Sequence, residues 1–378
     1  MKIASYFFIF HLFSAVLAIS PYKKMPAGSL IGYGCGNSLQ ATLCKPKGTG
    51  YTYCPCVDIN ALGSFIYCGY QKAANEKQRK EVQQYLKNAC PNMTTETMDN
   101  AYKNVTSYLV DTSLIPHFNK TAYVNYPIYH NETYYNLAFQ SYKHYTDNLT
   151  LSVAWGSGLV AFWGVLLILG GIDHWGSRFF PSYSLRLKRA LGQLRPLRWW
   201  RKNVTLPALL NEKHTTRSSL GGYFPTRFES VVIFVFLVLA ILSETVNIYT
   251  YRNSVIWKIY KIQLARFIGD RAGIVSVFLM VPTFLFAGRN NFFLWVTGWK
   301  QSTFLTFHKW LARTTIIVAT IHVIAYVINS SWQGLYSVRT PLAWWRFGSL
   351  AIVAGGFLFF QSLGFLRAYS YEIFLYFH

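Results

Sequence analysis

Two histidines in one apolar stretch, residues 304–328, are the side chains in this sequence best suited to chemistry. The stretch can cross a bilayer, because a membrane helix needs about 20 residues at 1.5 Å each. His308 and His322 are 14 residues apart. That spacing brings the second imidazole to within about 40° of the first and places it about 21 Å along the helix axis. Two haems stacked across a membrane need their ligands arranged in this way on one of the two helices that hold them.

The alternative is that each histidine only forms a hydrogen bond to a neighbouring helix. An ionisable side chain inside a membrane helix is costly, so its presence indicates function by default. Two such side chains on one face, spaced across the bilayer, favour metal ligation over packing.

The composition indicates a membrane protein. The 378 residues are 52% hydrophobic, 18% aromatic and only 13% charged, whereas a soluble chain of this length would form two or three domains. The chain has 36 basic and 14 acidic residues, a net charge of +22. Many of the basic residues lie in one loop, 173–229, between apolar spans, so membrane orientation explains them and nucleic acid is excluded as a partner.

Six cysteines lie in one early segment, and none occurs after it. An even set confined to one region predicts disulfides formed in an oxidising compartment, with 15 pairings open. A zinc site is the alternative, but no CxxC pair is present. The candidates are Cys35, Cys44, Cys54, Cys56, Cys68 and Cys90.

The N-terminal part of the chain has the features of an exported domain. Residues 1–20 predict a signal peptide, with a retained anchor as the alternative. Residues 21–150 are polar, carry all the cysteines, and include a predicted amphipathic helix over 76–90. Repeated acceptor sequons predict glycosylation outside the cytoplasm. The candidate sites are Asn92, Asn104, Asn119, Asn131, Asn148 and, after the fourth span, Asn329.

Five apolar spans follow, at 152–172, 231–249, 272–288, 304–328 and 347–366, and a sixth apolar run begins at Tyr371. We therefore predict an all-α polytopic membrane bundle with an N-terminal disulfide-bonded extracellular domain. Residues 151–229 would form the first span and a basic cytoplasmic loop, and 230–378 a haem domain. Within the loop, 184–203 predicts an interfacial helix on anionic lipid. Glu244 and Asn247 in the second span need a buried partner or a wet cavity.

Four motifs carry a resemblance to a known family. They are GRNN at 288–291, FHKWLAR around His308, His322, and RAYSYEIFLYFH ending at His378. The chain resembles the fungal ferric reductases, relatives of the NADPH oxidases. The resemblance implies that His308 and His378 bind an inner haem b. It implies that His322 binds an outer haem together with a histidine 14 residues beyond His378. That ligand and the cytosolic FAD and NADPH domains would lie beyond this sequence, so the chain is interpreted as truncated before them.

The activity implied by the resemblance is transmembrane electron transfer. NADPH would reduce FAD, and single electrons would pass through two haems to ferric or cupric chelates, including siderophores, for iron uptake. The redox chemistry belongs to the cofactors, so no catalytic side chain is predicted. Arg289 and Arg367 would contact haem propionates at the inner membrane edge, with simple anchoring as the alternative; Lys309 and Arg313 have the same two interpretations.

The resemblance implies the plasma membrane, with the vacuolar membrane as the alternative, and leaves the oligomeric state open. Two other functions remain. A superoxide-generating oxidase would share the histidine pattern. A non-catalytic fragment, or a membrane receptor with a disulfide-bonded head, would use the histidines only for packing.

Overall fold

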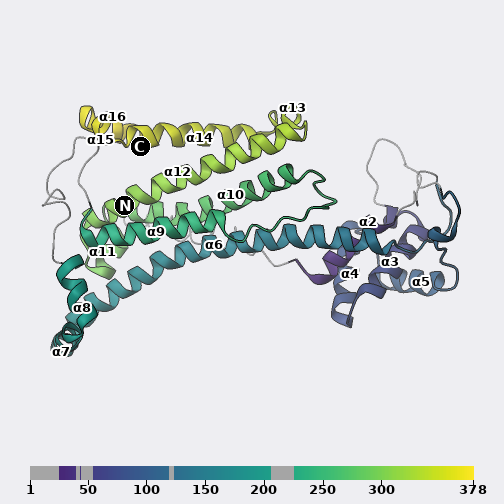
Figure 1. Ribbon diagram of the computed structural model, residues 1–378, viewed down its shortest axis with the longest axis horizontal. Helices are drawn as coiled ribbons and strands as arrows, with labels where there is room; N and C mark the ends of the chain where they lie inside the picture. The colour runs from purple at the N-terminus through teal and green to yellow at the C-terminus, as the bar shows by residue number, and fades with distance from the viewer. Residues whose placement is uncertain (1–24, 40–42, 44–53, 119–122, 206–224) are drawn as a thin grey trace. The chain divides into compact units, whose positions relative to one another are not determined.

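A computed structural model of the chain describes residues 25–39, 43, 54–118, 123–205 and 225–378 (Figure 1). The described residues are mainly helical, without a strand, and a single isolated bridge pairs Val110 with Ile128. The chain forms two compact units. Unit 2 combines Lys23–Asn148 with Tyr249–Gln263, and unit 1 contains Leu149–Ile248 and Leu264–His378. The predicted signal peptide, 1–20, lies outside the described residues.

Unit 2 is a cluster of short helices with polar caps. Its helices are α2 (Ala27–Ser38), α3 (Ile59–Lys72), α4 (Glu76–Ala89), α5 (Thr95–Val105) and the first part of α6. Side chains of Asp58, Asn75 and Thr94 accept hydrogen bonds from the first turns of α3, α4 and α5. Each cap satisfies backbone N–H groups that have no partner within the helix. Helix α4 confirms the amphipathic helix predicted over 76–90.

Apolar packing and disulfides hold these helices together. Phe65, Ile66, Leu86 and Met98 are fully buried in one core. Disulfides join Cys35 to Cys68 and Cys56 to Cys90. Each closes a loop of more than 30 residues, worth about 3 to 4 kcal/mol in the chain-entropy account. Cys54 is also disulfide-bonded, whereas Cys44 lies outside the described residues. The disulfide prediction is therefore confirmed for the two described bridges.

The predicted glycosylation sites differ in exposure. Asn92, Asn104 and Asn131 are exposed, and Asn119 lies outside the described residues. Asn148 is buried in α6, where its Nδ2 donates to the carbonyl oxygens of His144 and Tyr249, both at 2.7 Å. A glycan on this nitrogen would disrupt both hydrogen bonds.

The segment Tyr249–Gln263 joins unit 2 through polar contacts. Its Tyr249 backbone N–H donates to the Asn148 side chain at 3.1 Å, and the Val255 backbone N–H donates to Ser141 Oγ at 3.0 Å. The tyrosine and tryptophan rings of Tyr145 and Trp257 meet edge to face, 5.3 Å apart. This segment, which carries the basic residues Arg252, Lys258 and Lys261, therefore belongs to unit 2.

Unit 1 contains the membrane spans. Five described helices are long and apolar enough to cross a membrane: α6 (Glu132–Phe179), α9 (Arg227–Thr245), α10 (Tyr260–Ala287), α12 (Gln301–Trp332) and α14 (Ala343–Gln361). Each of the five predicted spans corresponds to one of these helices. Helices α6 and α12 extend beyond both ends of their predicted spans, whereas 231–249 and 347–366 run past the ends of α9 and α14. Helix α6 has 48 residues, more than its predicted span, because it also includes a polar first part that belongs to unit 2. Hydropathy identifies only the apolar part, which is suited to a bilayer.

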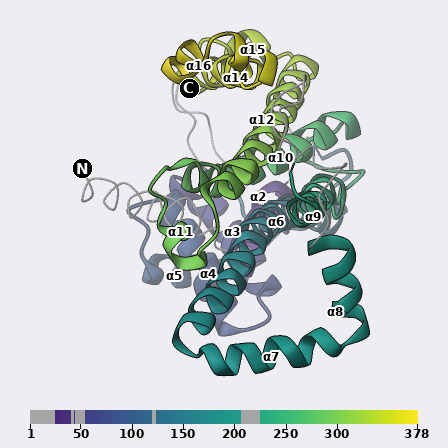
Figure 2. The same ribbon diagram turned by 90° about the vertical axis from the view of Figure 1, so that its left-hand side faces the viewer.

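Short helices connect the spans. They are α7 (Pro181–Gln193), α8 (Arg195–Trp200), α11 (Phe292–Thr297), α13 (Tyr336–Arg339), α15 (Gly364–Tyr369) and α16 (Tyr371–Phe377). A turn of π-helix, Arg201–Thr205, follows α8. Helix α7 lies across the end of α6 instead of continuing along it (Figure 2). The sixth apolar run is α16.

A tryptophan organises the core of unit 1. Trp163 of α6 is 2% exposed, and its ring lies 5.2, 5.4 and 5.0 Å from those of Phe236, Phe286 and Phe307. These phenylalanines belong to α9, α10 and α12. Four helices therefore pack around one side chain, which positions α12 against α10.

A buried arginine meets part of the predicted need for a polar partner near the second span, although both carboxylate oxygens of Glu244 are buried without a hydrogen-bond partner among the described residues. Arg271 of α10 is 1% exposed. It donates to Ser152 Oγ at 2.8 Å and to the carbonyl oxygens of Ser243, Val246 and Asn247 at 2.7 to 3.2 Å. Its charge also interacts with Glu244. The arginine thus caps the end of α9, where several carbonyl groups lack partners within the helix.

Candidate haem sites

His308 and His322 each form the same hydrogen bond to α10. His308 Nδ1 lies 2.8 Å from the carbonyl oxygen of Thr283, and His322 Nδ1 lies 2.7 Å from that of Gly269. A carbonyl oxygen can only accept, so both Nδ1 atoms carry a proton and donate. In the neutral form of each ring, Nε2 is then the unprotonated nitrogen, the one that can bind a metal ion. Metal-binding histidines commonly have their tautomer fixed in this way.

At His308, a second imidazole lies close to the first. The rings of His308 and His378 have centroids 6.1 Å apart and planes at 80°. An imidazole nitrogen binds a first-row metal at about 2 Å, and the centroid lies about 1.1 Å behind that nitrogen. Two imidazoles on opposite sides of one iron would therefore have centroids about 6 Å apart. The spacing between α12 and the end of α16 fits one iron with two histidine ligands.

At His322, the imidazole borders a cavity of about 290 Å³ between α12 and α14. Helix α14 lies beside α12 (Figure 1) and lines the cavity with small residues, Gly348, Ala351 and Gly355. Trp344 and Trp345 also line it. His322 is the only histidine among the described residues that border this space. An apolar space beside an available Nε2 fits a flat apolar cofactor.

Close packing against α10 fixes the position of His322. A Cβ atom at Gly273 would lie 2.6 Å from His322 Nδ1, and one at Gly269 would lie 2.6 Å from the Tyr326 ring. Glycine therefore permits the two helices to approach where the imidazole meets α10.

A polar group holds Tyr326 next to this imidazole. The rings of His322 and Tyr326 are 4.6 Å apart. The Tyr326 hydroxyl donates to Asp270, and Arg266 Nε donates to the other oxygen of Asp270 at 2.8 Å. The Arg266 guanidinium also lies 5.1 Å from the centre of the Tyr326 ring. Asp270 and Arg266 are on α10, so this helix holds both the imidazole and the ring that covers it.

Basic side chains gather near the His308 site. Lys309 and Arg313 of α12 both experience the charge of Arg367 in α15. Glu229 is the acidic group that acts on Lys309. Three cations near one apolar site suit an anionic ligand, and haem carries two propionates. Of the two arginines predicted at the membrane edge, the structure places Arg367 in this cluster. Arg289 is exposed.

The predicted sequon at Asn329 is buried at the end of α12. Its side chain is 0% exposed. Its Oδ1 accepts from Gln333 Nε2 at 2.6 Å and from Arg339 Nη1 at 3.2 Å. In the folded chain this asparagine holds the turn towards α13.

These features define a multi-pass helical membrane protein with a disulfide-bonded domain and two histidine positions on one span. Residues 272–378 match the family described as ferric reductase like transmembrane component. All three candidate ligands, His308, His322 and His378, lie within the match.

Curated fungal proteins extend this similarity. The chain is 30% identical over 244 residues to ferric/cupric reductase transmembrane component 1 of Candida albicans, covering 63% of this chain and 31% of that protein. It is 29% identical over 342 residues to ferric reductase transmembrane component 3 of Saccharomyces cerevisiae, covering 87% and 47%. Component 2 of the same yeast, a ferric/cupric reductase transmembrane component, is 27% identical over 333 residues, covering 84% and 45%.

The chain is therefore similar to fungal ferric reductase transmembrane components, over 84% to 87% of its own length for the two yeast proteins. It spans less than half the length of each of these three relatives. No solved structure matches it.

Several groups that complete these sites could not be identified from the sequence. The carbonyl groups of Thr283 and Gly269 act through the backbone, which any residue type would supply. Asp270 and Tyr326 are 56 residues apart, and Arg271 meets α9 through carbonyl groups. The buried arginine in an apolar helix was the one detectable signal, because such a residue indicates a functional or structural role.

Proposed function

We propose that this chain carries electrons across a membrane through b-type haem to ferric or cupric chelates on the outer side, in support of iron uptake. The close pair His308 and His378 carries this proposal, because their 6.1 Å separation fits one iron between them. The names of the fungal relatives support the acceptor.

Bound haem would supply a one-electron carrier whose potential depends on its surroundings. His308 and His378 would hold the iron from both sides and leave no coordination position for substrate. Lys309, Arg313 and Arg367 would neutralise the propionates. His322 would hold a second haem in the cavity beside α14.

In the whole protein, we propose that NADPH reduces FAD and that FAD supplies the electrons, as the resemblance implies. We place unit 2 outside the cell and the protein in the plasma membrane, with the vacuolar membrane as the alternative. Loop 173–229 would then be cytoplasmic, in agreement with its basic charge. Residues 1–20 would be removed as a signal peptide.

Difference spectra of membranes containing the chain test the ligands. We expect a b-type reduced-minus-oxidised signal that falls strongly in His308→Ala and in His378→Ala. The matched control is His174→Ala, which removes a histidine of α6 that faces neither site. A signal of unchanged size in both ligand variants, with normal protein levels, would contradict the proposal.

The acceptor is tested by reoxidation. The haem is reduced with dithionite, excess reductant is removed, and the decay of the reduced band is followed after mixing with ferric citrate or with oxygen. We expect ferric citrate to reoxidise the haem faster. Faster reoxidation by oxygen, with superoxide as product, would instead favour the oxidase.

Glycosidase treatment tests the orientation of unit 2. We propose glycans on the exposed Asn92, Asn104 and Asn131, and none on the buried Asn148 and Asn329. Each of the first three Asn→Gln variants should reduce the glycosidase-sensitive mass by one glycan. Glycosylation of Asn203 alone, within the basic loop, would invert the proposed orientation.

A further inference from the structure

Helices α7 and α8 have no buried residue, although α7 has a distinct apolar face. Tyr183, Leu187 and Leu191 follow at intervals of four residues, which places them in one row along the helix. They are 70%, 46% and 41% exposed. In a water-soluble helix, a row of this kind would normally face a core. Here it is open among the described residues.

Basic residues border this row. Arg186 and Arg189 of α7, Arg195 of α8 and Lys202 beyond it are all exposed. The sequence has no acidic residue between Asp173 and Glu212. An apolar row flanked only by positive charge is the pattern of a helix that lies in a membrane interface.

Contacts with α6 hold α7 in its orientation. Lys188 Nζ lies 2.7 Å from Asp173 Oδ1 and 3.0 Å from Ser177 Oγ. The hydroxyl groups of Ser177 and Ser184 are 3.1 Å apart. Helix α8 is fixed to α7 in turn, because Arg198 Nη2 donates to the Gln193 carbonyl oxygen at 3.0 Å.

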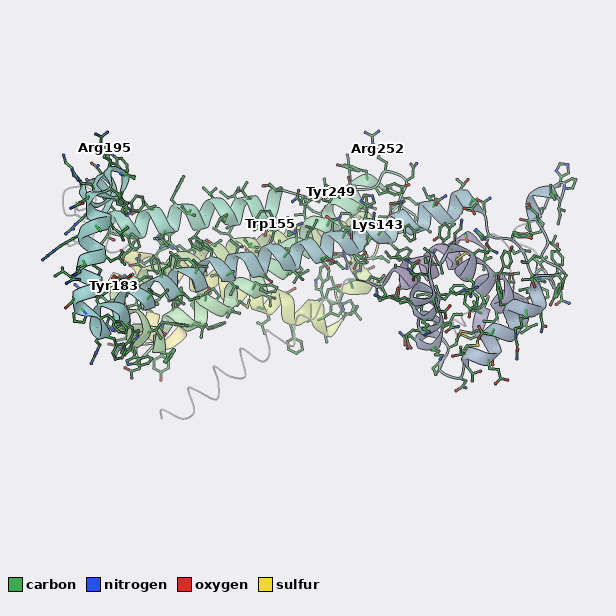
Figure 3. All side chains as sticks on the ribbon, turned by 90° about the horizontal axis from the view of Figure 1, so that it is seen from below. Lys143, Trp155, Tyr183, Arg195, Tyr249 and Arg252 are labelled. Carbon is green, nitrogen blue, oxygen red and sulfur yellow. A yellow bond between two sulfur atoms is a disulfide. The ribbon has the colours of Figure 1, made fainter. Side chains whose placement is uncertain are left out.

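The resulting arrangement suits a membrane surface. Helix α7 lies across the end of α6 (Figure 2), so it would run along the surface of the bilayer that α6 crosses. Tyr183 and Arg195 both lie at this end of unit 1 (Figure 3). Aromatic residues, including the 62% exposed Trp199, are preferred at this depth of a bilayer.

We propose that residues 181–200 are a docking surface for anionic membrane lipid. The row Tyr183, Leu187 and Leu191 enters the boundary between headgroups and acyl chains, and Arg186, Arg189 and Arg195 bind lipid phosphates. Each basic residue near an anionic leaflet contributes about a fivefold gain in affinity. This inference is independent of haem and of the proposed electron transfer.

Lipid-specific fluorescence quenching tests the inference on the full chain. The described residues contain no free cysteine, so an Ala190→Cys variant provides a labelling position on the apolar face of α7. The labelled protein is reconstituted in phosphatidylcholine vesicles with a fixed fraction of phosphatidylserine. In paired samples, either the phosphatidylcholine or the phosphatidylserine carries bromine at the same mole fraction.

We expect both brominated lipids to quench the label, and brominated phosphatidylserine to quench at least twofold more. The triple variant Arg186→Gln, Arg189→Gln, Arg195→Gln should lower that ratio to about one, as should high salt. The matched control neutralises three exposed lysines of unit 2, Lys77, Lys80 and Lys103, and should leave the ratio unchanged. Circular dichroism verifies that each variant remains helical.

Two results would overturn the inference. Equal quenching by both lipids in the unmodified sequence would show a membrane contact without anionic preference. Absence of quenching would show that water or another protein segment covers the apolar row.

Discussion

The His308 and His322 sites share one helix and one kind of hydrogen bond but differ in what lies beside each imidazole. Both Nδ1 atoms donate to carbonyl groups of α10. Close to His308 lies a second imidazole, His378, whereas His322 borders a cavity. The pair α10 and α12 therefore fixes the tautomer of each histidine, whereas later elements determine what lies beside each ring: His378 at one, and the cavity lined by α14 at the other.

The charge around the two sites differs as well. Lys309, Arg313 and Arg367 surround the first with positive charge. At the second, Tyr326 and Asp270 form a hydrogen bond beside the imidazole, and Arg266 pairs with the same carboxylate. A haem at the first site would thus have a higher reduction potential than its two histidine ligands alone would give it, since nearby positive charge stabilises the reduced state.

The largest expected difference between the two sites is in the binding of carbon monoxide to reduced haem. A haem between His308 and His378 would have no open coordination position, whereas no second histidine among the described residues borders the cavity beside His322. We expect part of the reduced haem to bind carbon monoxide. His322→Ala should abolish that fraction, and His308→Ala should preserve it. The measurement is the carbon monoxide difference spectrum of the reduced chain.

The opposite pattern would break the comparison. If carbon monoxide binding survived His322→Ala but disappeared in His308→Ala, the open coordination position would belong to the His308 site. The cavity beside α14 would then not be the site of the haem that binds carbon monoxide.

Filling the cavity should affect one site only. A Cβ atom at Gly355 would lie 3.8 Å from Ile316, an ordinary contact, so the rest of a leucine side chain would enter the cavity. We expect Gly355→Leu to lower the carbon monoxide-binding haem at least tenfold and to leave the other signal unchanged. The control is Gly356→Leu, because a Cβ there meets no atom within 4 Å and Gly356 does not line the cavity. Equal losses in both variants would point to a general defect in α14.

The membrane spans could be predicted because apolarity is a local property. Residues 304–328 and 347–366 indicated α12 and α14 within a few residues, and fixed helical geometry placed His308 and His322 on one face. Polar helix extensions were missed for the same reason. The first 20 residues of α6 are as helical as the rest, but nothing in their hydropathy distinguishes them from other parts of an exported domain.

The contacts that complete the sites depend on tertiary structure and could not be predicted. The need for a partner near Glu244 was evident from its cost in a membrane, but Arg271 was not identified, because their helices are joined by a segment folded into unit 2. Likewise, the segment Tyr249–Gln263 joins unit 2 through backbone contacts with Asn148 and Ser141, which no local sequence pattern indicates.

Removing one positive charge near His308 should moderately shift the midpoint potential of the haem proposed there, which distinguishes that site from the His322 site. Arg367→Gln removes a cation from the cluster near His308. At a distance of several ångströms in a protein environment, one charge contributes on the order of 1 kcal/mol, or about 40 mV for one electron. We expect the midpoint potential of the carbon monoxide-insensitive haem to fall by about that amount in a spectroelectrochemical titration. Arg289→Gln, the exposed control, should shift it far less, and equal shifts would remove Arg367 from the site.

Tyr326→Phe should produce the smallest effect, limited to the His322 site. The ring beside the imidazole is retained, and only the hydrogen bond to Asp270 is lost, so we expect a loss of about 1 kcal/mol in stability. Because Asp270 keeps its pair with Arg266, the carboxylate would not be left alone. The carbon monoxide dissociation rate should change about twofold, and the signal of the other haem should not.

A double-mutant cycle with Asp270→Asn separates this hydrogen bond from general packing. If Asp270 acts on His322 by holding the Tyr326 hydroxyl, adding Tyr326→Phe to Asp270→Asn should have little further effect on carbon monoxide dissociation. Full additivity would mean that the ring of Tyr326 and the carboxylate act independently. The His322 site would then depend on Gly269 and Gly273 alone for its position against α10.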